Sequence, residues 1–356
     1  MHKIKVFLGG YVNYLNAQNI NCRALSEQLD RNKFKISTML FPIGNAKDFK
    51  PLGDVKYIKL RRPVRLMRYW SYLKGISGAD VAFLPKEEIV CFSRVIAKIF
   101  RSKLFCTVEG MIDDWSVSRL PKRRQKSYIN SFAKFEPHLY AITKYIAEDV
   151  GDRRGYKFNE QILYLGVDSK KFINTKKIIN GLNNIVFIGF DSIRKNIYDL
   201  FDVAKRNKNI RFHIIGGNDL KGDTVEDYIR RENLTNVTYY GRLDHAELSK
   251  LLKDMDLMYF PSRSEGFPKV HLETACAGVP TMCYPDYGAE EWIKNGVNGI
   301  IVNNKEEADT MIKRLKEHPE ELKSLSKEAI KLGMSFDWDN LVKIWEKEIE
   351  KIYNEK

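Results

Sequence analysis

The chain has 356 residues, of which 44% are hydrophobic and 12% aromatic. Such a supply of apolar side chains excludes a disordered or low-complexity chain. Because a single hydrophobic core seldom grows beyond about 250–300 residues, the length predicts two domains. The five cysteines show neither Cys-x-x-Cys spacing nor a histidine at zinc-site spacing, so we expect buried thiols in a reducing cytoplasm. These cysteines are Cys22, Cys91, Cys106, Cys276 and Cys283.

The positive charge is unevenly distributed along the chain. The net charge is +14, and residues 1–165 hold 30 Lys and Arg against 15 Asp and Glu. The remaining residues hold 30 basic and 31 acidic side chains. The first half therefore carries all of the excess, which favours an anionic partner: nucleic acid, a phospholipid surface or a charged acceptor. A solvated basic surface without a partner is the alternative.

Neither a signal peptide nor a membrane span is expected. The N-terminal sequence MHKIKVFLGG has too short an apolar run for a signal peptide, and no later stretch has the roughly 20 apolar residues that cross a bilayer. The sequence thus predicts a cytoplasmic protein that meets a membrane, if at all, peripherally from its inner face.

The first half alternates apolar runs with amphipathic segments such as 16–29 and 92–100. Alternation of strands and helices predicts a parallel sheet that is covered on both faces. A polar Lys/Asn-rich stretch at 168–184 then interrupts the pattern and suggests a linker. The predicted strands of this half are residues 4–8, 36–41, 81–84, 104–108 and 139–142.

A second series of the same kind follows the predicted linker. Helices are expected from about Lys195, Val225, His245, Pro268, Ala289 and Lys305, and its strands at 185–188, 210–215, 237–240, 257–260, 281–284 and 299–302. The fold class is therefore α/β, with two Rossmann-like, doubly wound domains at 1–167 and 185–337. Ligands of such sheets gather at the carboxyl ends of the strands, so a cleft between the domains is the expected site. An amphipathic helix at 338–356 is expected to cross back onto the first domain.

The segment FPSRSEGFPKVHLETACAGVP, residues 260–280, reads as strand, loop, helix and glycine stop. Pro268 suits a first helical turn, and Gly278 suits the position just beyond the last turn. Unpaired amides and the positive dipole end would make the helix tip at 264–267 an anion site, and Gly266 would allow close approach. A diphosphate is the expected anion.

Two glutamates bracket this helix tip. Glu265 lies in the loop and Glu273 in the second half of the helix, and carboxylates are well shaped to accept hydrogen bonds from vicinal hydroxyls. The alternative is that Glu265 caps the helix and Glu273 lies on a solvated face.

This segment resembles the Glu-x7-Glu signature of retaining GT-B glycosyltransferases, the glycosyltransferase family 4 or group 1 enzymes. The resemblance continues through GAEEWIKNGVNGIIV (288–302), NVTYYGRLDHAELSKLLKDMDLMYFPS (236–262) and the glycine loop RFHIIGGND (211–219). It covers the chain from about residue 139 onward and is weak before that point.

The resemblance implies a GT-B fold with an acceptor-binding first domain and a nucleotide-sugar-binding second domain. It implies that Glu273 binds the ribose and Glu265 the donor sugar, and that Arg242 borders the base. Lys195 would clamp the diphosphate, and Gly266, Phe267 and Pro268 would bring the loop to it, with Gly216 in the glycine loop also on the donor side.

The chain departs from the family pattern at two positions. The family's strand ending in Gly-Arg reads Gly189-Phe190 here, so that one phosphate contact is missing unless Arg194 supplies it. Many members carry a sugar-contacting His where Glu109 stands, and Glu109 could accept a hydrogen bond, assist the acceptor, or be an ordinary loop residue. Gly10, after the first strand, would face the diphosphate, although a glycine pair there more often forms a turn.

Two further patterns favour structural roles. Asp254-Met255-Asp256 has the Asp-x-Asp spacing of metal-dependent transferases but straddles a helix end and a strand start, so no metal is expected. His271 is expected to be packed or to support the site from behind rather than to act as a base.

The basic half contains its own candidate surface. Residues 59–74 combine six cations with Tyr69, Trp70 and Tyr72, and residues 121–126 add four more. Cations beside interfacial aromatic residues favour an anionic membrane. Nucleic acid is the alternative, and we expect the membrane because the resemblance implies a sugar transferase and such enzymes commonly act on lipid-linked acceptors.

Taken together, the sequence predicts a retaining, metal-independent glycosyltransferase that needs no cofactor. It would move a hexose-type sugar from a UDP- or GDP-sugar to an acceptor hydroxyl of a glycan, such as a lipid-linked or polysaccharide intermediate. The alternatives are a non-catalytic nucleotide-sugar or polyanion-binding protein, a nucleic-acid binder, and a GT-B nucleotide-sugar epimerase.

Overall fold

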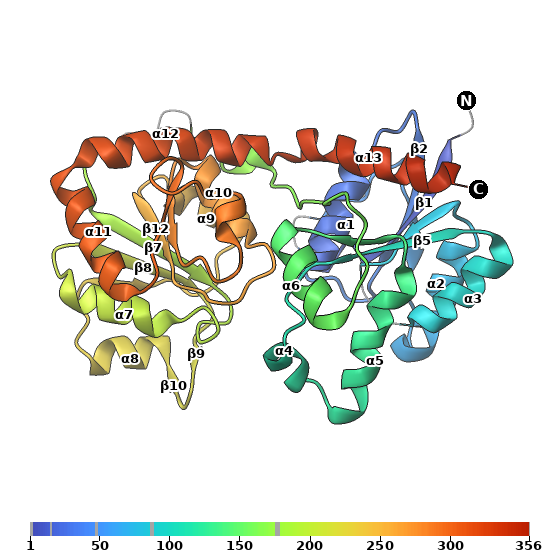
Figure 1. Ribbon diagram of the computed structural model, residues 1–356, viewed down its shortest axis with the longest axis horizontal. Coiled ribbons are helices and arrows are strands. Elements are labelled where there is room, and N and C mark those ends of the chain that lie inside the picture. The colour runs from blue at the N-terminus through green and yellow to red at the C-terminus, as the bar shows by residue number, and fades with distance from the viewer. Residues whose placement is uncertain (1–2, 15, 47–48, 86–88, 175–178, 356) are drawn as a thin grey trace. The chain divides into compact units, whose positions relative to one another are not determined.

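The computed structural model describes residues 3–14, 16–46, 49–85, 89–174 and 179–355. The chain folds into two compact units. Unit 1 comprises residues 1–166 and 338–356, and unit 2 comprises residues 167–337. Figure 1 shows a sheet with helices on both faces in each unit.

Unit 1 contains a six-stranded parallel sheet of order β3-β2-β1-β4-β5-β6. This order is that of a Rossmann fold, in which the connections reverse direction between the first and fourth strands. The strands are β1 (Ile4–Tyr11), β2 (Phe34–Leu40), β3 (Lys56–Lys59), β4 (Val81–Phe83), β5 (Lys103–Val108) and β6 (Leu139–Ala141). The helices are α1 (Ala17–Gln28), α2 (Val64–Ile76), α3 (Val90–Phe100), α4 (Asp114–Ser118), α5 (Lys122–Phe132), η1 (Ala133–Phe135) and α6 (Lys144–Arg154).

The C-terminal helix α13 (Trp338–Asn354) packs on unit 1 through buried side chains. The indole of Trp345 lies 5.4 Å from the ring of Phe83 and donates to the carbonyl of Tyr164 at 3.1 Å. The carboxylate of Glu346 accepts from the amide of Asp30 at 2.7 Å. The predicted return of this helix to the first domain is therefore confirmed.

Unit 2 repeats the same topology with strand order β11-β8-β7-β12-β13-β14. Its helices α7, α8, α9, α10, α11 and α12 are Ile197–Arg206, Val225–Arg231, His245–Leu252, Lys269–Cys276, Lys305–Glu317 and Pro319–Ser335, with the short helices η2 (Ser169–Lys171) and η3 (Ala289–Glu291). The strands are β7 (Asn184–Gly189), β8 (Arg211–Gly216), β11 (Val237–Tyr239), β12 (Leu257–Phe260), β13 (Thr281–Cys283) and β14 (Gly299–Ile301), besides the small antiparallel pair β9 (Asp219–Leu220) and β10 (Asp223–Thr224).

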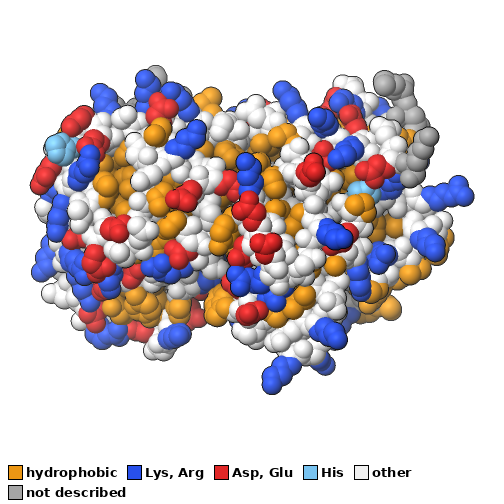
Figure 2. All heavy atoms as spheres, in the orientation of Figure 1, with side chains coloured by type: hydrophobic (Ala, Val, Ile, Leu, Met, Phe, Trp, Pro, Cys, Tyr) orange, Lys and Arg blue, Asp and Glu red, His pale blue; other side chains and the backbone are white. Residues whose placement is uncertain are grey.

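The prediction of two doubly wound α/β domains is thus confirmed. The core of unit 2 is formed by β-branched and aromatic residues of the central strands, such as Ile185, Phe187 and Tyr259. In Figure 2, basic and acidic side chains are interspersed over the visible face of unit 2, which agrees with its balanced composition.

The stretch 168–184 is not a free linker. Ser249 in α9 donates to the carbonyl of Lys171, the amide of Ser169 donates to Asp337, and the side chain of Leu182 is buried in the core of unit 2. The sequence did not predict these contacts, because the stretch is mostly polar and has few apolar residues that would indicate packing. Residues 175–178 lie outside the described residues.

Candidate functional site

The helix α10 begins where the sequence predicts an anion site. Pro268 precedes its first residue with an extended backbone, and no side chain caps the N-terminal amides. The ring of Phe267 is buried against Trp292 and Phe336, at centroid distances of 4.8 and 5.6 Å. Because Phe267 is anchored in this way, the loop enters the helix along one fixed course, with the N-terminal end of the helix dipole next to Glu265.

Glu265, in the loop before α10, binds two cations from the loop that follows β7. Its Oε1 lies 2.9 Å from Nζ of Lys195 and 3.0 Å from a guanidinium nitrogen of Arg194. The hydroxyl of Ser262 donates to the same oxygen at 2.8 Å. Strands β7 and β12 are neighbours at the point where the strand order reverses, which is where ligands of doubly wound sheets bind.

Lys195 is buried, and its burial is unusual for a lysine. Its ammonium lies 4.3 Å from the centroid of the Phe260 ring, and its side chain is only 10% exposed. Burial lowers the pKa of Lys195, and the charge of Glu265 opposes that shift. The charged lysine therefore depends on an anionic neighbour, which Glu265 provides and a diphosphate could also provide.

Glu273 lies deeper along α10, and among the described residues its carboxylate has no partner within hydrogen-bonding distance. Its carboxylate pairs with Nε2 of His245 at 3.8 Å, beyond hydrogen-bonding distance. Burial raises the pKa of Glu273, and the positive charges of His245, Lys269 and Lys171 oppose the shift. The predicted solvated-face alternative for Glu273 is wrong, since the residue is only 9% exposed. A buried carboxylate without a hydrogen bond is costly unless a ligand supplies donors.

Strands β7 and β8 of unit 2 end in glycines, and Gly241 lies two residues after β11. The amide of Gly216 donates to Gly241, and the amide of Gly217 donates to Gly189, at 2.8 and 3.0 Å. Gly216 has φ +136, and a Cβ there would lie 1.8 Å from the carbonyl oxygen of Gly189. A side chain at residue 216 is therefore excluded by both conformation and space.

Phe190 stands where the resemblance expects an arginine, and it is 64% exposed. The guanidinium of Arg242, in the loop after β11, lies 4.1 Å from the centroid of the Phe190 ring. A cation is therefore present at this end of the sheet, but it is Arg242 stacked on Phe190 rather than an arginine at position 190. Arg194, the predicted replacement, is instead bound to Glu265 and to the carbonyl of Ser264.

In unit 1, Gly10 is part of β1 rather than of a turn after it. A Cβ on Gly10 would lie 2.7 Å from the side chain of Cys22 in α1, so the glycine allows close packing of helix on strand. Glu109 follows β5, and its carboxylate accepts from Asn21 of α1 at 2.8 Å and from Thr107 at 3.2 Å. These contacts fix the orientation of Glu109 within unit 1.

His271 is packed, as the sequence predicts. Its Nδ1 accepts from the indole of Trp292 at 3.1 Å, and its Nε2 lies 3.4 Å from the hydroxyl of Tyr287. Burial lowers the pKa of His271 well below its usual value, which suits a neutral structural imidazole. Asp256, of the Asp-x-Asp pattern, accepts from the amides of Asn183 and Asn184.

Metal ligands of the usual kind are not clustered in the described part of the chain. Among residues 3–14, 16–46, 49–85, 89–174 and 179–355, no three His, Cys, Asp or Glu side chains are grouped so that they could hold an ion. In the same residues, no helix has the length and apolarity needed to cross a bilayer.

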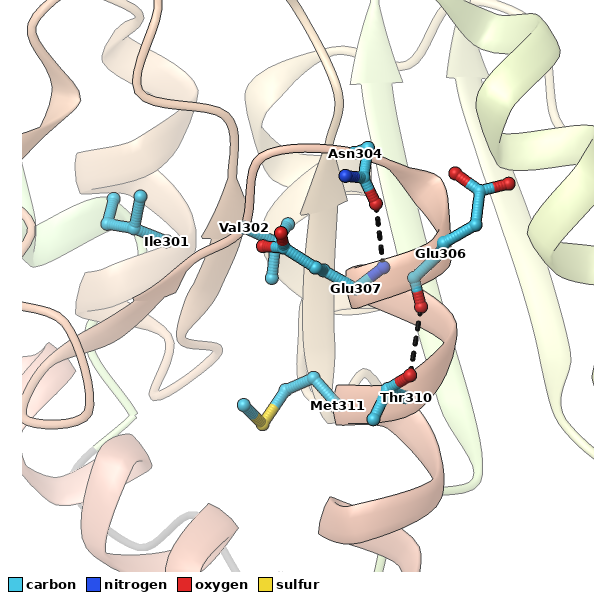
Figure 3. Close-up of a pocket in the computed structure, with 7 residues that line it drawn as sticks. All are labelled: Ile301, Val302, Asn304, Glu306, Glu307, Thr310 and Met311. Atoms are coloured by element: carbon cyan, nitrogen blue, oxygen red, sulfur yellow. Dashed lines mark hydrogen bonds between the residues drawn. The ribbon is translucent and has the colours of Figure 1, made fainter.

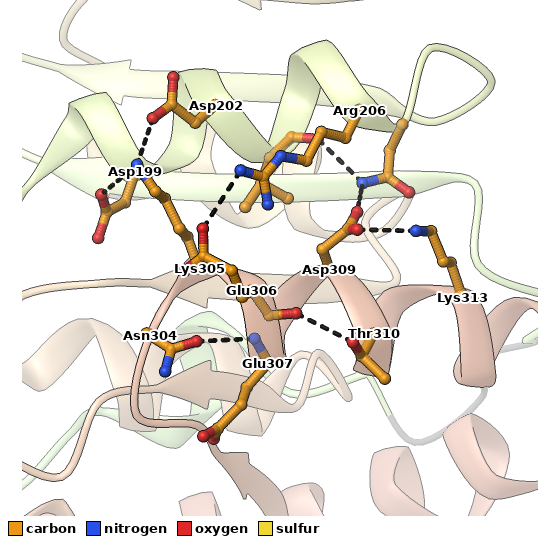
Figure 4. A network of polar contacts seen from close by, with 12 residues as sticks. Asp199, Asp202, Arg206, Asn304, Lys305, Glu306, Glu307, Asp309, Thr310 and Lys313 are labelled. Atoms are coloured by element: carbon orange, nitrogen blue, oxygen red, sulfur yellow. Dashed lines mark hydrogen bonds and ion pairs between the residues drawn. The ribbon is translucent and has the colours of Figure 1, made fainter.

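A cavity of about 400 Å³ lies beside β14 and the start of α11, away from the residues described above. Figure 3 shows Glu306 and Glu307 at its wall, with Asn304 accepting from the amide of Glu307. Two carboxylates make this cavity unsuited to a diphosphate. Next to it, Lys305 pairs with Asp202 at 2.6 Å and fastens α11 to α7 (Figure 4).

Besides the ion pairs of Glu265 with Lys195 and Arg194, three contacts of the site were not predicted from the sequence. These are the bond from Ser262 to Glu265, the pairing of His245 with Glu273, and the stacking of Arg242 on Phe190. The first lies within one loop, so the position of Ser262 three residues before Glu265 was a local signal. The other two join residues from different elements, which only the topology brings together.

Comparisons with known proteins agree on one family. Residues 168–332 match the family model described as glycosyl transferases group 1. An uncharacterized glycosyltransferase of Methanocaldococcus jannaschii is 25% identical over 61% of this chain and 59% of its own length. The alpha-galactosylglucosyldiacylglycerol synthase of Streptococcus pneumoniae is 26% identical over 62% of each chain. The chain therefore matches less than two thirds of the length of these relatives.

The fold is similar to that of solved glycosyltransferase structures. The Anabaena HepE protein, crystallised in complex with UDP and glucose, superposes with a TM-score of 0.76 over 98% of this chain and 100% of that chain, at 16% identity. At that identity the likeness shows the fold alone. Residues 168–332 are therefore similar to the glycosyl transferases group 1 family, and the chain has the GT-B fold.

Proposed function

We propose that the protein is a retaining glycosyltransferase that transfers a hexose-type sugar from a UDP- or GDP-sugar to an acceptor hydroxyl. The observation that carries the proposal is the contact of Glu265 with two cations beside the uncapped end of α10. These groups come from the two strand ends where a doubly wound sheet binds its ligand. UDP in the similar HepE structure supports a uridine nucleotide.

In the proposed complex, the diphosphate binds the N-terminal amides of α10 and the ammonium of Lys195. Negative charge grows on the diphosphate as the bond to the sugar breaks, and fixed donors in a dry site stabilise that charge. Glu265 then accepts from hydroxyls of the donor sugar, and Glu273 accepts from the ribose. The weak partner of Glu273 in the free protein supports this role, since bound hydroxyls would satisfy its carboxylate.

We further propose that transfer needs no metal ion and keeps the anomeric configuration. Lys195 and the helix amides would supply the positive potential that a divalent cation supplies elsewhere. The check is direct: EDTA should leave the rate unchanged, and NMR of the product should show the anomer of the donor. A rate restored by added Mg²⁺ or Mn²⁺ after chelation would contradict metal independence.

The acceptor is proposed to be a lipid-linked or cell-surface saccharide. The relative named alpha-galactosylglucosyldiacylglycerol synthase supports a lipid acceptor, and the basic first half supports an anionic surface. In unit 1, Glu109 is held between Asn21 and Thr107 and is the carboxylate proposed to meet the acceptor or sugar hydroxyl.

The proposal is tested by thermal stabilisation with a panel of nucleotides and nucleotide sugars, followed by a transfer assay with the stabilising donor. Glu265→Gln should abolish transfer, and Glu317→Gln, on the exposed end of α11, is the matched control. Failure of every nucleoside diphosphate and nucleotide sugar to stabilise the protein would refute the proposal.

A second candidate function is a non-catalytic nucleotide-sugar-binding protein. It is favoured by one observation, the exposed Phe190 at the position where the resemblance expects a phosphate-binding arginine. Donor binding without transfer or hydrolysis, over a panel of acceptors, would support it. An epimerase would instead convert the nucleotide sugar in the absence of any acceptor.

A further inference from the structure

Helices α2 and α3 of unit 1 pack against each other and leave large apolar side chains exposed. The rings of Tyr69 in α2 and Phe92 in α3 are 5.1 Å apart and join the two helices. Around this contact, six exposed apolar residues, Tyr69 among them, form what we call the α2–α3 face. They are Leu66, Tyr69 and Trp70 on α2 and Val95, Ile99 and Phe100 on α3, with exposed fractions between 44% and 67%.

The exposed side chains follow the helical repeat. Leu66 and Trp70 are four residues apart on α2, and Val95 and Ile99 are four apart on α3, so each pair lies on one face of its helix. Folded proteins normally bury such a stripe, and a large apolar patch left open marks a surface that binds something.

The charged side chains on helices α2 and α3 themselves are all basic. Arg61, Arg62 and Arg65 at the start of α2, and Arg94 and Lys98 on α3, are exposed. Neither helix contains an aspartate or glutamate. In Figure 2, hydrophobic and basic side chains predominate over the region where Figure 1 places α2 and α3. The face therefore attracts anions all along its length.

A cavity of about 560 Å³ opens beside α3. Three cations, Arg94, Lys98 and Lys134, line it together with one carboxylate, Glu136. The apolar side chain of Val95 belongs both to this cavity and to the α2–α3 face. A phosphate group held there would thus lie next to the aliphatic surface, which is the arrangement of a phospholipid at a bilayer surface.

Other occupants fit this surface less well. In a two-fold contact between copies of the chain, each patch of arginines would face an identical patch, and like charges repel. Nucleic acid would pair with the cations and stack on Trp70, but it offers no partner for the exposed Leu66, Val95 and Ile99. A bilayer satisfies both the cations and the aliphatic side chains.

We propose that the α2–α3 face, with the cations beside it, docks the protein on an anionic phospholipid bilayer. The apolar residues enter the interface, and Arg94 and Lys98 meet lipid phosphates. This inference rests on the proposed function and extends it, because a transferase that is docked on the membrane would meet a lipid-linked acceptor there.

The test is sedimentation of the full chain with vesicles in 50 mM and 500 mM NaCl. Vesicles of phosphatidylcholine alone are compared with vesicles that contain 30% phosphatidylglycerol. The protein should bind only the anionic vesicles, and less in high salt. Arg94→Gln with Lys98→Gln should weaken partitioning about fivefold for each cation. Leu66→Ser with Ile99→Ser should weaken it about tenfold for each residue.

The matched control is Lys316→Gln with Lys323→Gln, which removes two exposed cations from unit 2. It should sediment like the unchanged protein. The inference is overturned if the unchanged protein ignores anionic vesicles, or if both α2–α3 variants bind as it does. It is also overturned if the variants lose binding to an RNA or duplex oligonucleotide, or lose self-association, while vesicle binding is unaffected.

A nucleotide measurement separates this inference from the proposed function. Thermal stabilisation by UDP depends on unit 2, so it should be the same in all variants and also shows that each one is folded. If UDP stabilises the protein but the protein does not bind vesicles, the docking inference is refuted and the proposed transferase function is not. Vesicle binding without any effect of nucleotides refutes the proposed transferase and leaves docking supported.

Discussion

Replacement of Glu265 by glutamine tests whether its carboxylate merely holds the site together or takes part in transfer. In the free protein this carboxylate neutralises Lys195 and Arg194 at 2.9 and 3.0 Å. A bound diphosphate would offer negative charge to the same two cations. Glutamine keeps the shape and removes the charge, so the variant leaves both cations without their anionic partner until a nucleotide arrives.

The loss of stability can be bounded from the exposure of the three groups. Breaking a buried ion pair by removal of one partner costs about 3–5 kcal/mol. The side chains of Glu265 and Lys195 are 9% and 10% exposed, but that of Arg194 is 26% exposed and is partly screened by solvent. Glutamine also keeps one acceptor oxygen, so a loss of about 2–3 kcal/mol is expected. For a domain of this size the melting temperature should fall by about 4–12 °C.

Nucleotide binding should behave in the opposite sense to stability. Because UDP no longer competes with Glu265 for the cations, its affinity for the variant should be equal to or higher than for the unchanged protein, and its thermal shift larger. The transfer rate should fall at least about a hundredfold, since the sugar hydroxyls lose their charged acceptor and the amide NH₂ of glutamine stands in place of one carboxylate oxygen. Calorimetric titration with UDP and a single-turnover transfer assay measure the two effects. A tenfold weaker affinity for UDP, or an unchanged transfer rate, would refute this account.

Three further predictions concern other residues of unit 2. Gly216→Ala should destabilise unit 2 by about 3 kcal/mol, because its Cβ would collide with the carbonyl of Gly189, and chemical denaturation measures this. Glu273 has a raised pKa, so its burial costs stability above that pKa and the cost disappears as the pH falls through it. Glu273→Gln should therefore melt higher without ligand at pH 8, by a margin that narrows toward pH 5, while it binds UDP more weakly. Phe190→Ala should release Arg242 from the stack and weaken UDP binding about two- to fivefold, as measured by calorimetry. If the variant and the unchanged protein bind UDP equally, the stack does not contribute to UDP binding.

Much of the fold could be predicted because the strands are buried on both faces. Runs such as residues 185–188 and 257–260 are apolar throughout, and each became a strand of the sheet in unit 2. The edge strand β3, residues 56–59, escaped prediction, because only Ile58 in it is buried and its lysines are exposed. The short helix α4 likewise lacks a long apolar stripe, and Asp113 caps it locally.

The candidate site was predictable where its residues are close in sequence. The loop and helix around Glu265 and Glu273 carry their own start and stop signals, Pro268 and Gly278. The partner of each carboxylate was not predictable, because Lys195 lies 70 residues before Glu265 and His245 is on a different helix from Glu273. Spacing alone does not encode such contacts, since they depend on which strands become neighbours.

Glycines at the strand ends explain how the lysine reaches its carboxylate. A Cβ on Gly189 would lie 2.3 Å from Cδ of Lys195, so the lysine stem can cross the end of β7 only because residue 189 has no side chain. Gly216 allows β8 to approach that same strand end, where its own Cβ would strike the backbone of Gly189. These glycines therefore allow neighbouring backbone and side-chain atoms to come close to the strand ends, and their role is not flexibility. They bring a buried lysine against the loop of Glu265, and an anion beside it, from the protein or from a ligand, opposes the fall in its pKa that burial causes.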